Sequence, residues 1–156
     1  MKLLIVNFWD PENTKYFGRY SDAIDILVRS LKESEVFSIG VSKGAEEPLK
    51  EKIGGLQRAI KHAKTNNFDR LFILGEGVVL TPIEFQKMVE VDSEVVLTKN
   101  EDFSCCLIRV RTLEVYPIPY MGEFSPPDKM WLKLLRQNSI KISIIGGVKT
   151  VCLNEL

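Results

Sequence analysis

Hydrophobic positions in the first half of the chain follow two alternating patterns. Three runs predict strands: residues 2–7, a short apolar run without alternation that is typical of a strand buried on both faces of a sheet, and residues 35–41 and 68–74. Between them, residues 21–30 and a longer segment from Pro48 to Asn66 carry apolar side chains at helical spacing. Ser21 or Asp22 is the expected N-cap of the first helix. The order strand, helix, strand, helix, strand predicts right-handed crossovers and a parallel sheet, with residues 3–6, 37–41 and 71–74 side by side.

The second half of the chain is less regular. A helix is predicted over residues 82–90 with Thr81 as its N-cap, and Asp128 is predicted to cap a helix that ends at residue 137. The remaining predicted elements are short: strands at 94–98, 103–110, 140–145 and 148–153, and a helix or turn at 111–115. No repeat or linker interrupts the chain. The pattern therefore predicts one α/β domain over residues 1–156, with a Rossmann-like, mainly parallel sheet, flanking helices and a more irregular C-terminal half.

The charge balance excludes some classes of partner. Lys and Arg together number 21, as do Asp and Glu, so the formal net charge of the 156 residues is zero. A general basic field for nucleic acid is therefore not indicated. No apolar run approaches the roughly 18 residues of a membrane span. The start, MKLLIVNFWD, predicts a first strand and not a signal peptide.

The cysteines and the single histidine exclude further kinds of site. Cys105, Cys106 and Cys152 are odd in number and two are adjacent, which argues against a secreted disulfide framework. One bridge to Cys152 stays open, but free thiols in a reducing compartment are favoured, so a cytoplasmic location is expected. Cys105 and Cys106 should not bridge each other, because neighbours on a strand point to opposite faces. His62 alone excludes a His-rich metal cluster.

Candidate chemistry should lie where the predicted parallel strands end, because ligands of such sheets bind beyond the carboxyl ends of the strands. Three loops leave these ends: residues 8–13, 41–44 and 75–77. Phe8, Trp9 and Asp10 offer aromatic surface and one acid, which suit a nucleotide base; packing of both rings is the alternative. Neither GxGxxG nor a P-loop is present. Gly54-Gly55 lies within a helical pattern, which predicts a close packing site.

Four segments together resemble a known family. They are KLLIVNFWD at the start, KIGGLQRAIKHA at 52–63, FDRLFILGEGVVLTPIEFQKMV at 68–89, and SCCLIRVRTLEVYPIPYMGEFSPPDKMWLKLLRQNSIKI at 104–142. Their order resembles the nucleotide-diphospho-sugar transferase fold of glycosyltransferases, the GT-A type, in a compact form. The resemblance implies a nucleotide-binding half over residues 1–82 and an acceptor-side half over residues 83–156.

The resemblance fails at the motif after the third strand. The family has Asp-x-Asp there, and its two carboxylates hold Mn²⁺ or Mg²⁺ against the donor's diphosphate. The matching positions here are Gly75, Glu76 and Gly77, so only the middle residue is acidic. Either Glu76 holds a metal with waters and phosphates, or the site works without metal, or catalysis is lost. A plain tight turn with a solvated Glu76 is the remaining interpretation.

Other implied site residues follow from the same resemblance. At the end of the second strand, where the family often has an acid, Lys43 would meet a phosphate or be solvated. Asp128 matches the position of the general base in inverting enzymes, with Glu123 in reserve. The aromatic residues Tyr120, Phe124 and Trp131 would line the acceptor side, although core packing is a strong alternative for Trp131.

Three functions are open at this point. The first is a glycosyltransferase that moves a sugar from a nucleotide-sugar donor to a hydroxyl acceptor, with weak or lost activity because one acid stands where the family has two. The second is a non-catalytic module of the same fold that binds a nucleotide, a sugar or a protein. The third is an unrelated doubly wound α/β protein with a structural role.

Overall fold

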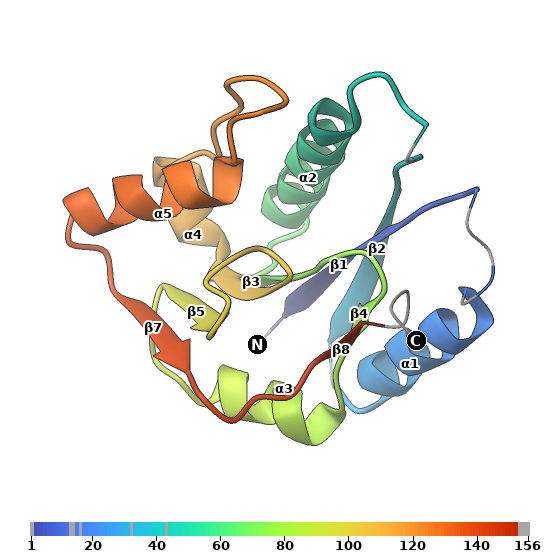
Figure 1. Cartoon of the computed structure of the whole chain (residues 1–156). Coiled ribbons are helices and arrows are strands. Elements are labelled where there is room, and N and C mark those ends of the chain that lie inside the picture. The colour runs from blue at the N-terminus through green and yellow to red at the C-terminus, as the bar shows by residue number, and fades with distance from the viewer. Residues whose placement is uncertain (1, 13–14, 16, 32, 43, 153–156) are drawn as a thin grey trace.

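The three strands predicted in the first half of the chain lie side by side in a six-stranded sheet (Figure 1). The computed structural model describes residues 2–12, 15, 17–31, 33–42 and 44–152. Strand β1 (Leu3–Trp9) pairs in parallel with β2 (Ser34–Gly40) on one side and β3 (Arg70–Leu74) on the other. All five residues of β3 are buried. The parallel arrangement predicted from the apolar runs is therefore confirmed.

One strand of the sheet runs against the others. The order is β2-β1-β3-β6-β5-β7, and β6 (Cys105–Arg109) is antiparallel to both β3 and β5 (Val95–Thr98). Strand β7 (Ile142–Ile145) pairs in parallel with β5. A second sheet joins β4 (Val78–Val79) to β8 (Val151–Cys152) in an antiparallel pair. The sequence pattern did not predict β4, because a two-residue strand carries too little periodicity.

Helices cover both faces of the six-stranded sheet (Figure 1). On one face, α2 (Pro48–Thr65), α4 (Val110–Val115) and α5 (Pro127–Gln137) bury side chains against Leu4 and Val6. On the other, α1 (Phe17–Arg29) and α3 (Pro82–Val89) pack against Leu3 and Ile5. Side chains alternate along each strand, so β1 contributes to both cores. None of the described helices is long and apolar enough to cross a membrane.

The cysteine prediction is confirmed by the same alternation. Cys106 belongs to the core under α2, whereas Cys105 belongs to the core under α1 and α3. Both thiols are buried, and Cys152 is also free. The two adjacent cysteines thus point to opposite faces of β6, and neither forms a disulfide.

The helix caps correct two sequence predictions. Helix α1 begins at Phe17, so Ser21 and Asp22 lie within it and are not its N-cap. Helix α5 has Pro126 at its N-cap position, with no side-chain cap, and Asp128 is the second helical residue. The prediction for Thr81 is confirmed, because its Oγ1 accepts a hydrogen bond of 3.2 Å from the backbone N of Glu84.

Helix α2 approaches β2 closely at one of its two glycines. A Cβ atom on Gly55 would lie 2.4 Å from Cγ2 of Ile39, a distance that real contacts do not reach. At Gly54 the nearest atom would be Arg58 Nη1 at 3.8 Å, an ordinary contact. The predicted packing site is therefore Gly55 alone, and it sets how near the N-terminal half of α2 stands to the sheet.

Candidate functional site

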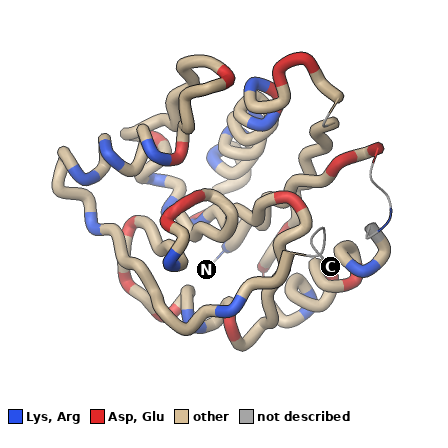
Figure 2. The backbone as a smooth tube through the Cα atoms, viewed as in Figure 1, with Lys and Arg blue, Asp and Glu red and all other residues tan. Residues whose placement is uncertain are grey.

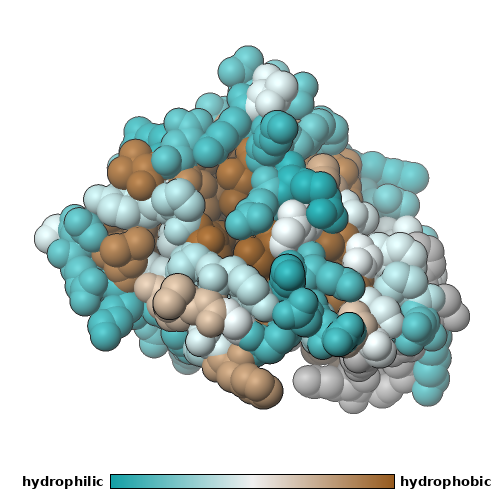
Figure 3. Space-filling model, turned by 90° about the horizontal axis from the view of Figure 1, so that it is seen from above, coloured by the Kyte–Doolittle hydropathy of each residue, from teal (hydrophilic) through white to brown (hydrophobic). Residues whose placement is uncertain are grey.

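A cavity of about 700 Å³ opens at the carboxyl ends of β1 and β3, between α2 and the segments that lead into β6 and α5. Seen from above, it is an apolar hollow within a hydrophilic rim (Figure 3). The apolar walls include Phe8 from β1, Ile53 and Leu56 from α2, and Phe103 from the loop before β6. An α/β sheet binds ligands at this edge, and the volume suits a small molecule.

The cavity unites predicted site residues from distant parts of the chain. Those that line it are Phe8, Gly75, Glu76, Glu123, Phe124 and Asp128. Those that are not part of its lining are Trp9, Asp10, Gly77, Tyr120 and Trp131. Lys43 lies outside the described residues. The end of the first strand, the turn after the third strand and the start of α5 therefore meet at one place.

The turn after β3 is built around its two glycines. The backbone N of Gly75 donates a hydrogen bond of 2.9 Å to the carbonyl of Ser104, which joins the turn to the loop before β6. A Cβ atom on Gly75 would lie 3.2 Å from Cα of Ser104, tighter than nearly all real contacts. Gly77 has φ of 71°, in the left-handed region that favours glycine. Gly75 and Gly77 thus each have a backbone reason to be glycine in this turn.

The residues around this turn do not fit a protein-held divalent cation. Within the described ranges, no group of three His, Cys, Asp or Glu side chains is placed to hold a metal ion. The turn itself supplies one carboxylate, that of Glu76. The carboxylate of Asp102, across the cavity lining, accepts hydrogen bonds from the backbone N of Ser104 at 2.9 Å and from the Ser104 hydroxyl. A cation here would depend on waters and ligand oxygens for most of its shell.

Two aspartates, Asp102 and Asp128, line the α5 side of the cavity. Asp128 is in the first turn of α5, where the helix dipole favours a negative charge. Its Oδ1 accepts a hydrogen bond of 2.8 Å from the backbone N of Lys129. Burial raises the pKa of the Cys106 thiol well above its ordinary value, and negative charge on Cys105, Asp102 and Asp128 raises it further. Both aspartates are therefore near the same buried thiol.

Glu123 joins the loop before α5 to the start of α2. Its carboxylate accepts hydrogen bonds from the backbone N of Leu49 at 3.0 Å and of Lys50 at 2.9 Å, and from the Tyr120 hydroxyl at 2.9 Å. Burial raises the pKa of Glu123, but these bonds lower it more, so the net direction is downward. Burial, and then the bond to Glu123, raises the pKa of Tyr120 to about 12. Both side chains thus anchor this loop.

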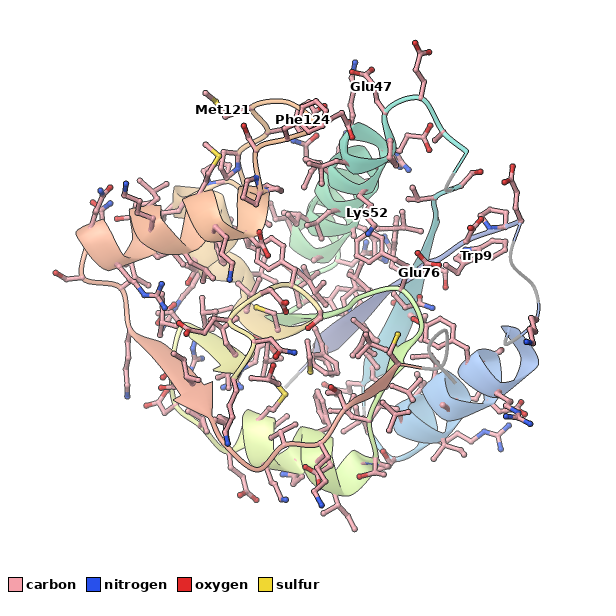
Figure 4. The ribbon with its side chains drawn as sticks, in the orientation of Figure 1. Trp9, Glu47, Lys52, Glu76, Met121 and Phe124 are labelled. Carbon is pink, nitrogen blue, oxygen red and sulfur yellow. The ribbon has the colours of Figure 1, made fainter. Side chains whose placement is uncertain are left out.

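The remaining predicted residues have structural surroundings. Trp131 is fully buried, and its Nε1 donates a hydrogen bond of 2.6 Å to the carbonyl of Tyr116, which agrees with the core-packing interpretation. Trp9 packs against the core under α1. Asp10 is buried, and its Oδ1 accepts a hydrogen bond of 2.9 Å from the backbone N of Glu12. Phe124 is fully exposed on the loop above α2, near Met121 (Figure 4).

Sequence reasoning missed Lys52, Asp102 and Ser104. Among the described residues that line the cavity, Lys52 is the sole cation, and its Nζ lies 5.7 Å from the ring centroid of Phe8. Lys52 precedes Leu56 by four positions, so both lie on one helical face, and this spacing was a usable signal. Asp102 and Ser104 form a local turn whose place beside residue 75 depends on the antiparallel pairing of β6.

Solved structures of other proteins show which known fold this chain resembles. The structure is similar to a protein from Desulfovibrio desulfuricans G20 that is assigned as a nucleotide-diphospho-sugar transferase, with TM-score 0.57 and 13% identity over 94% of this chain and 80% of that one. It is similar to the catalytic domain of Drosophila β1,4-galactosyltransferase 7, solved with xylobiose, with TM-score 0.65 and 7% identity over 92% of this chain and 65% of that one.

A third similar structure has different chemistry. A cytidylyltransferase from Leptospira borgpetersenii serovar Hardjo-bovis (strain JB197) matches with TM-score 0.57 and 12% identity over 99% of this chain and 83% of that one. The sequence matches no protein-family model and no curated protein. Identities this low establish the architecture and not the activity. The chain therefore has the GT-A-like fold that nucleotide-sugar transferases and this cytidylyltransferase share.

Proposed function

We propose that the chain binds a nucleotide-sugar donor in the cavity at the ends of β1 and β3 and transfers the sugar to a hydroxyl acceptor. The observation that carries the proposal is the convergence of Phe8, the turn at residues 75–77 and Asp128 on one cavity of about 700 Å³. These three features belong to the segments that carry the family resemblance. The GT-A-like architecture supports the same assignment.

The proposed chemistry assigns one role to each side of the cavity. Phe8 offers an aromatic face for the donor, while Asp128 accepts the proton of the acceptor hydroxyl as that oxygen attacks the anomeric carbon. The bond from the anomeric carbon to the phosphate oxygen breaks, and the nucleoside diphosphate leaves with its electron pair. Asp128 suits this role better than Glu123, because three hydrogen bonds already engage the Glu123 carboxylate. Phe124, exposed at the rim, offers a face for the acceptor sugar.

A titration and a turnover assay test the proposal. We expect UDP, GDP or CDP to bind in calorimetry, and the matching nucleotide-sugar to be hydrolysed slowly when no acceptor is present. Binding should weaken when Phe8, the aromatic residue of the cavity wall, is replaced by Leu, while the exposed variant Lys61→Met binds normally. Absence of binding by every nucleoside diphosphate, with or without Mn²⁺, would overturn the assignment.

A non-catalytic binding module on the same fold is the second candidate. The glycine-built turn favours it, because residue 75 has little room for a side chain and residue 77 has a φ that favours glycine. Nucleotide binding without donor hydrolysis would distinguish this module from a transferase. The third interpretation, an unrelated doubly wound α/β protein with a structural role, would be favoured if no nucleotide bound.

A further inference from the structure

We infer that the cavity binds the donor's phosphates without a divalent cation and that the ammonium group of Lys52 takes the cation's place. The inference rests on the proposed function, because it concerns how a nucleoside diphosphate is held in that cavity. Three features of the structure carry it: the geometry of the turn at residues 75–77, the position of Lys52, and the arrangement of the cavity's acids.

The turn geometry removes the usual metal ligands. A carboxylate at residue 75 would need the backbone of Ser104 to move, because even its Cβ would lie 3.2 Å from Cα of that residue. The 2.9 Å hydrogen bond from the Gly75 N to the Ser104 carbonyl opposes this movement. Gly77, with φ of 71°, is also in a conformation that favours glycine. The absence of acids is thus built into the backbone of the turn, and among the described residues no three-ligand group replaces them.

Lys52 supplies the positive charge that a diphosphate requires. Its side chain extends from α2 into the same opening as Glu76 (Figure 4). Apolar walls surround it, with Ile53 and Leu56 on α2 and the Phe8 ring 5.7 Å below the ammonium. Water is scarcer beside such walls than on an open surface, so a charge interaction there is screened less. A lysine ammonium binds phosphate as a point charge with three rotatable donors.

The acids of the cavity favour one orientation of the ligand. Basic residues follow α2, whereas acidic residues occupy the loops across from it (Figure 2). Backbone N–H groups of α2 and the Tyr120 hydroxyl already engage Glu123. Asp102 and Asp128 lie together near Cys106, on the α5 side. Glu76 shares the opening with Lys52 and reduces its attraction for a phosphate, but Lys52 is the sole cation among the described lining residues. A phosphate is therefore drawn to Lys52 and repelled from the α5 side, which leaves the sugar, whose hydroxyls can donate to carboxylates, beside Asp102 and Asp128.

The test compares nucleotide binding with and without metal. Calorimetry measures UDP, GDP and CDP, and the three nucleosides, against the full chain in excess EDTA and in MnCl₂. The variants are Lys52→Met, which removes the charge but keeps an unbranched side chain, and Lys61→Met on the exposed side of the same helix. We expect the diphosphate to bind equally in EDTA and Mn²⁺. We expect Lys52→Met to weaken the diphosphate at least tenfold, to leave the nucleoside unchanged, and Lys61→Met to change neither.

The outcomes separate this inference from the function on which it rests. Diphosphate binding that needs Mn²⁺, or that Lys52→Met leaves intact, overturns the role of Lys52 while the proposed function stands. Equal affinity for diphosphate and nucleoside also overturns it, because the phosphates would then contribute nothing. If no nucleotide binds under any condition, the proposed function fails and the inference fails with it. A circular dichroism spectrum of Lys52→Met that matches the wild type shows that the variant is folded.

Discussion

The carboxylate of Glu123 accepts a hydrogen bond of 2.9 Å from the backbone N of Lys50, across 73 positions of sequence. Helix α2 has Glu47 at its N-cap position, and the Glu47 side chain makes no capping bond. Glu123 therefore satisfies N–H groups of the first turn that the helix itself leaves unpaired. This contact also fixes the loop at residues 116–126 beside the cavity, so the shape of the rim depends on it.

We predict that Glu123→Ala loosens both the loop and the start of α2. The backbone N–H groups of Leu49 and Lys50 lose their acceptor, and the Tyr120 hydroxyl loses its partner. Amide hydrogen exchange should become faster at the first turn of α2 and throughout the loop, while β1 and β3 keep their protection. Glu114→Ala, an exposed change on α4, is the matched control. Unchanged exchange at Leu49 and Lys50 would show that this anchor contributes nothing.

We predict that the ionised side chain of Glu94 stabilises the folded protein and that this stabilisation is lost in acid. A hydrogen bond with Arg111 lowers the pKa of Glu94 to about 2, assisted by Thr112 and by the charges of Arg111 and Arg109, although burial opposes the shift. An unfolded glutamate titrates at about 4.3. Because the folded pKa is lower, the contribution of Glu94 is fully present above about pH 4.3 and is lost as the pH falls toward about 2.

Urea unfolding of Glu94→Gln from pH 2 to pH 7 measures this contribution. The variant should be less stable than the wild type at neutral pH, and the difference should shrink as the pH falls through the window between the two pKa values. Glu90→Gln, an exposed neighbour, should match the wild type throughout. A difference that stays constant with pH would contradict the assignment of the ion pair as its source.

The two adjacent glycines of α2 should respond to alanine in opposite ways. At Gly55 the new Cβ would meet Ile39 Cγ2 at 2.4 Å, so we expect Gly55→Ala to destabilise the protein by about 1–3 kcal/mol. At Gly54 the space is open, and alanine should stabilise the helix by about 0.5–1 kcal/mol. Thermal unfolding measures both changes. In an Ile39→Ala background, where the clashing side chain is absent, Gly55→Ala should cost less stability than it does in the wild type. Equal changes in unfolding temperature for Gly54→Ala and Gly55→Ala would contradict the close contact between Gly55 and Ile39.

We predict that Asp128→Asn lowers donor hydrolysis by roughly 10²- to 10⁴-fold if Asp128 is the general base. Nucleotide affinity should stay unchanged, and stability should change little, because Asp128 is the second residue of α5 and not its N-cap. Glu114→Gln, an exposed change on α4 outside the cavity lining, controls for loss of one negative charge. Full hydrolysis by Asp128→Asn would remove this residue from the mechanism.

The parallel core of the fold could be predicted because its causes are local. Apolar runs define β1 and β3, a more mixed run defines β2, and helical spacing defines α2, so the pattern is visible within short windows. Strand β4 has two residues, which leave no periodicity to detect, and its partner β8, which lies within the predicted strand at 148–153, is more than 70 positions away. The start of α1 at Phe17 was also missed, because Gly18 and Arg19 interrupt the apolar spacing of its first turn.

The candidate site could be predicted only in part, for a related reason. Glu76 and Asp128 were recognised through the family resemblance, and both line the cavity. Lys52 was overlooked because an isolated lysine on a helix usually contacts water, although its spacing from Leu56 places both on one helical face. The anchoring contacts of Glu123 join residues far apart in sequence, so no local signal predicts them.

The last prediction concerns restoring the family's two acids. Gly75→Asp places a side chain against the backbone of Ser104, and we expect it to cost about 1–3 kcal/mol of stability. Gly77→Asp should cost less, because aspartate tolerates the left-handed region better than most residues, and φ is 71° here. We expect the double variant to gain no tight Mn²⁺ binding in calorimetry, because forming the metal site requires the 102–104 loop to move. Strong Mn²⁺ binding at unchanged urea stability would show that the turn accepts carboxylates, and the loss of the two acids would then have no geometric cause.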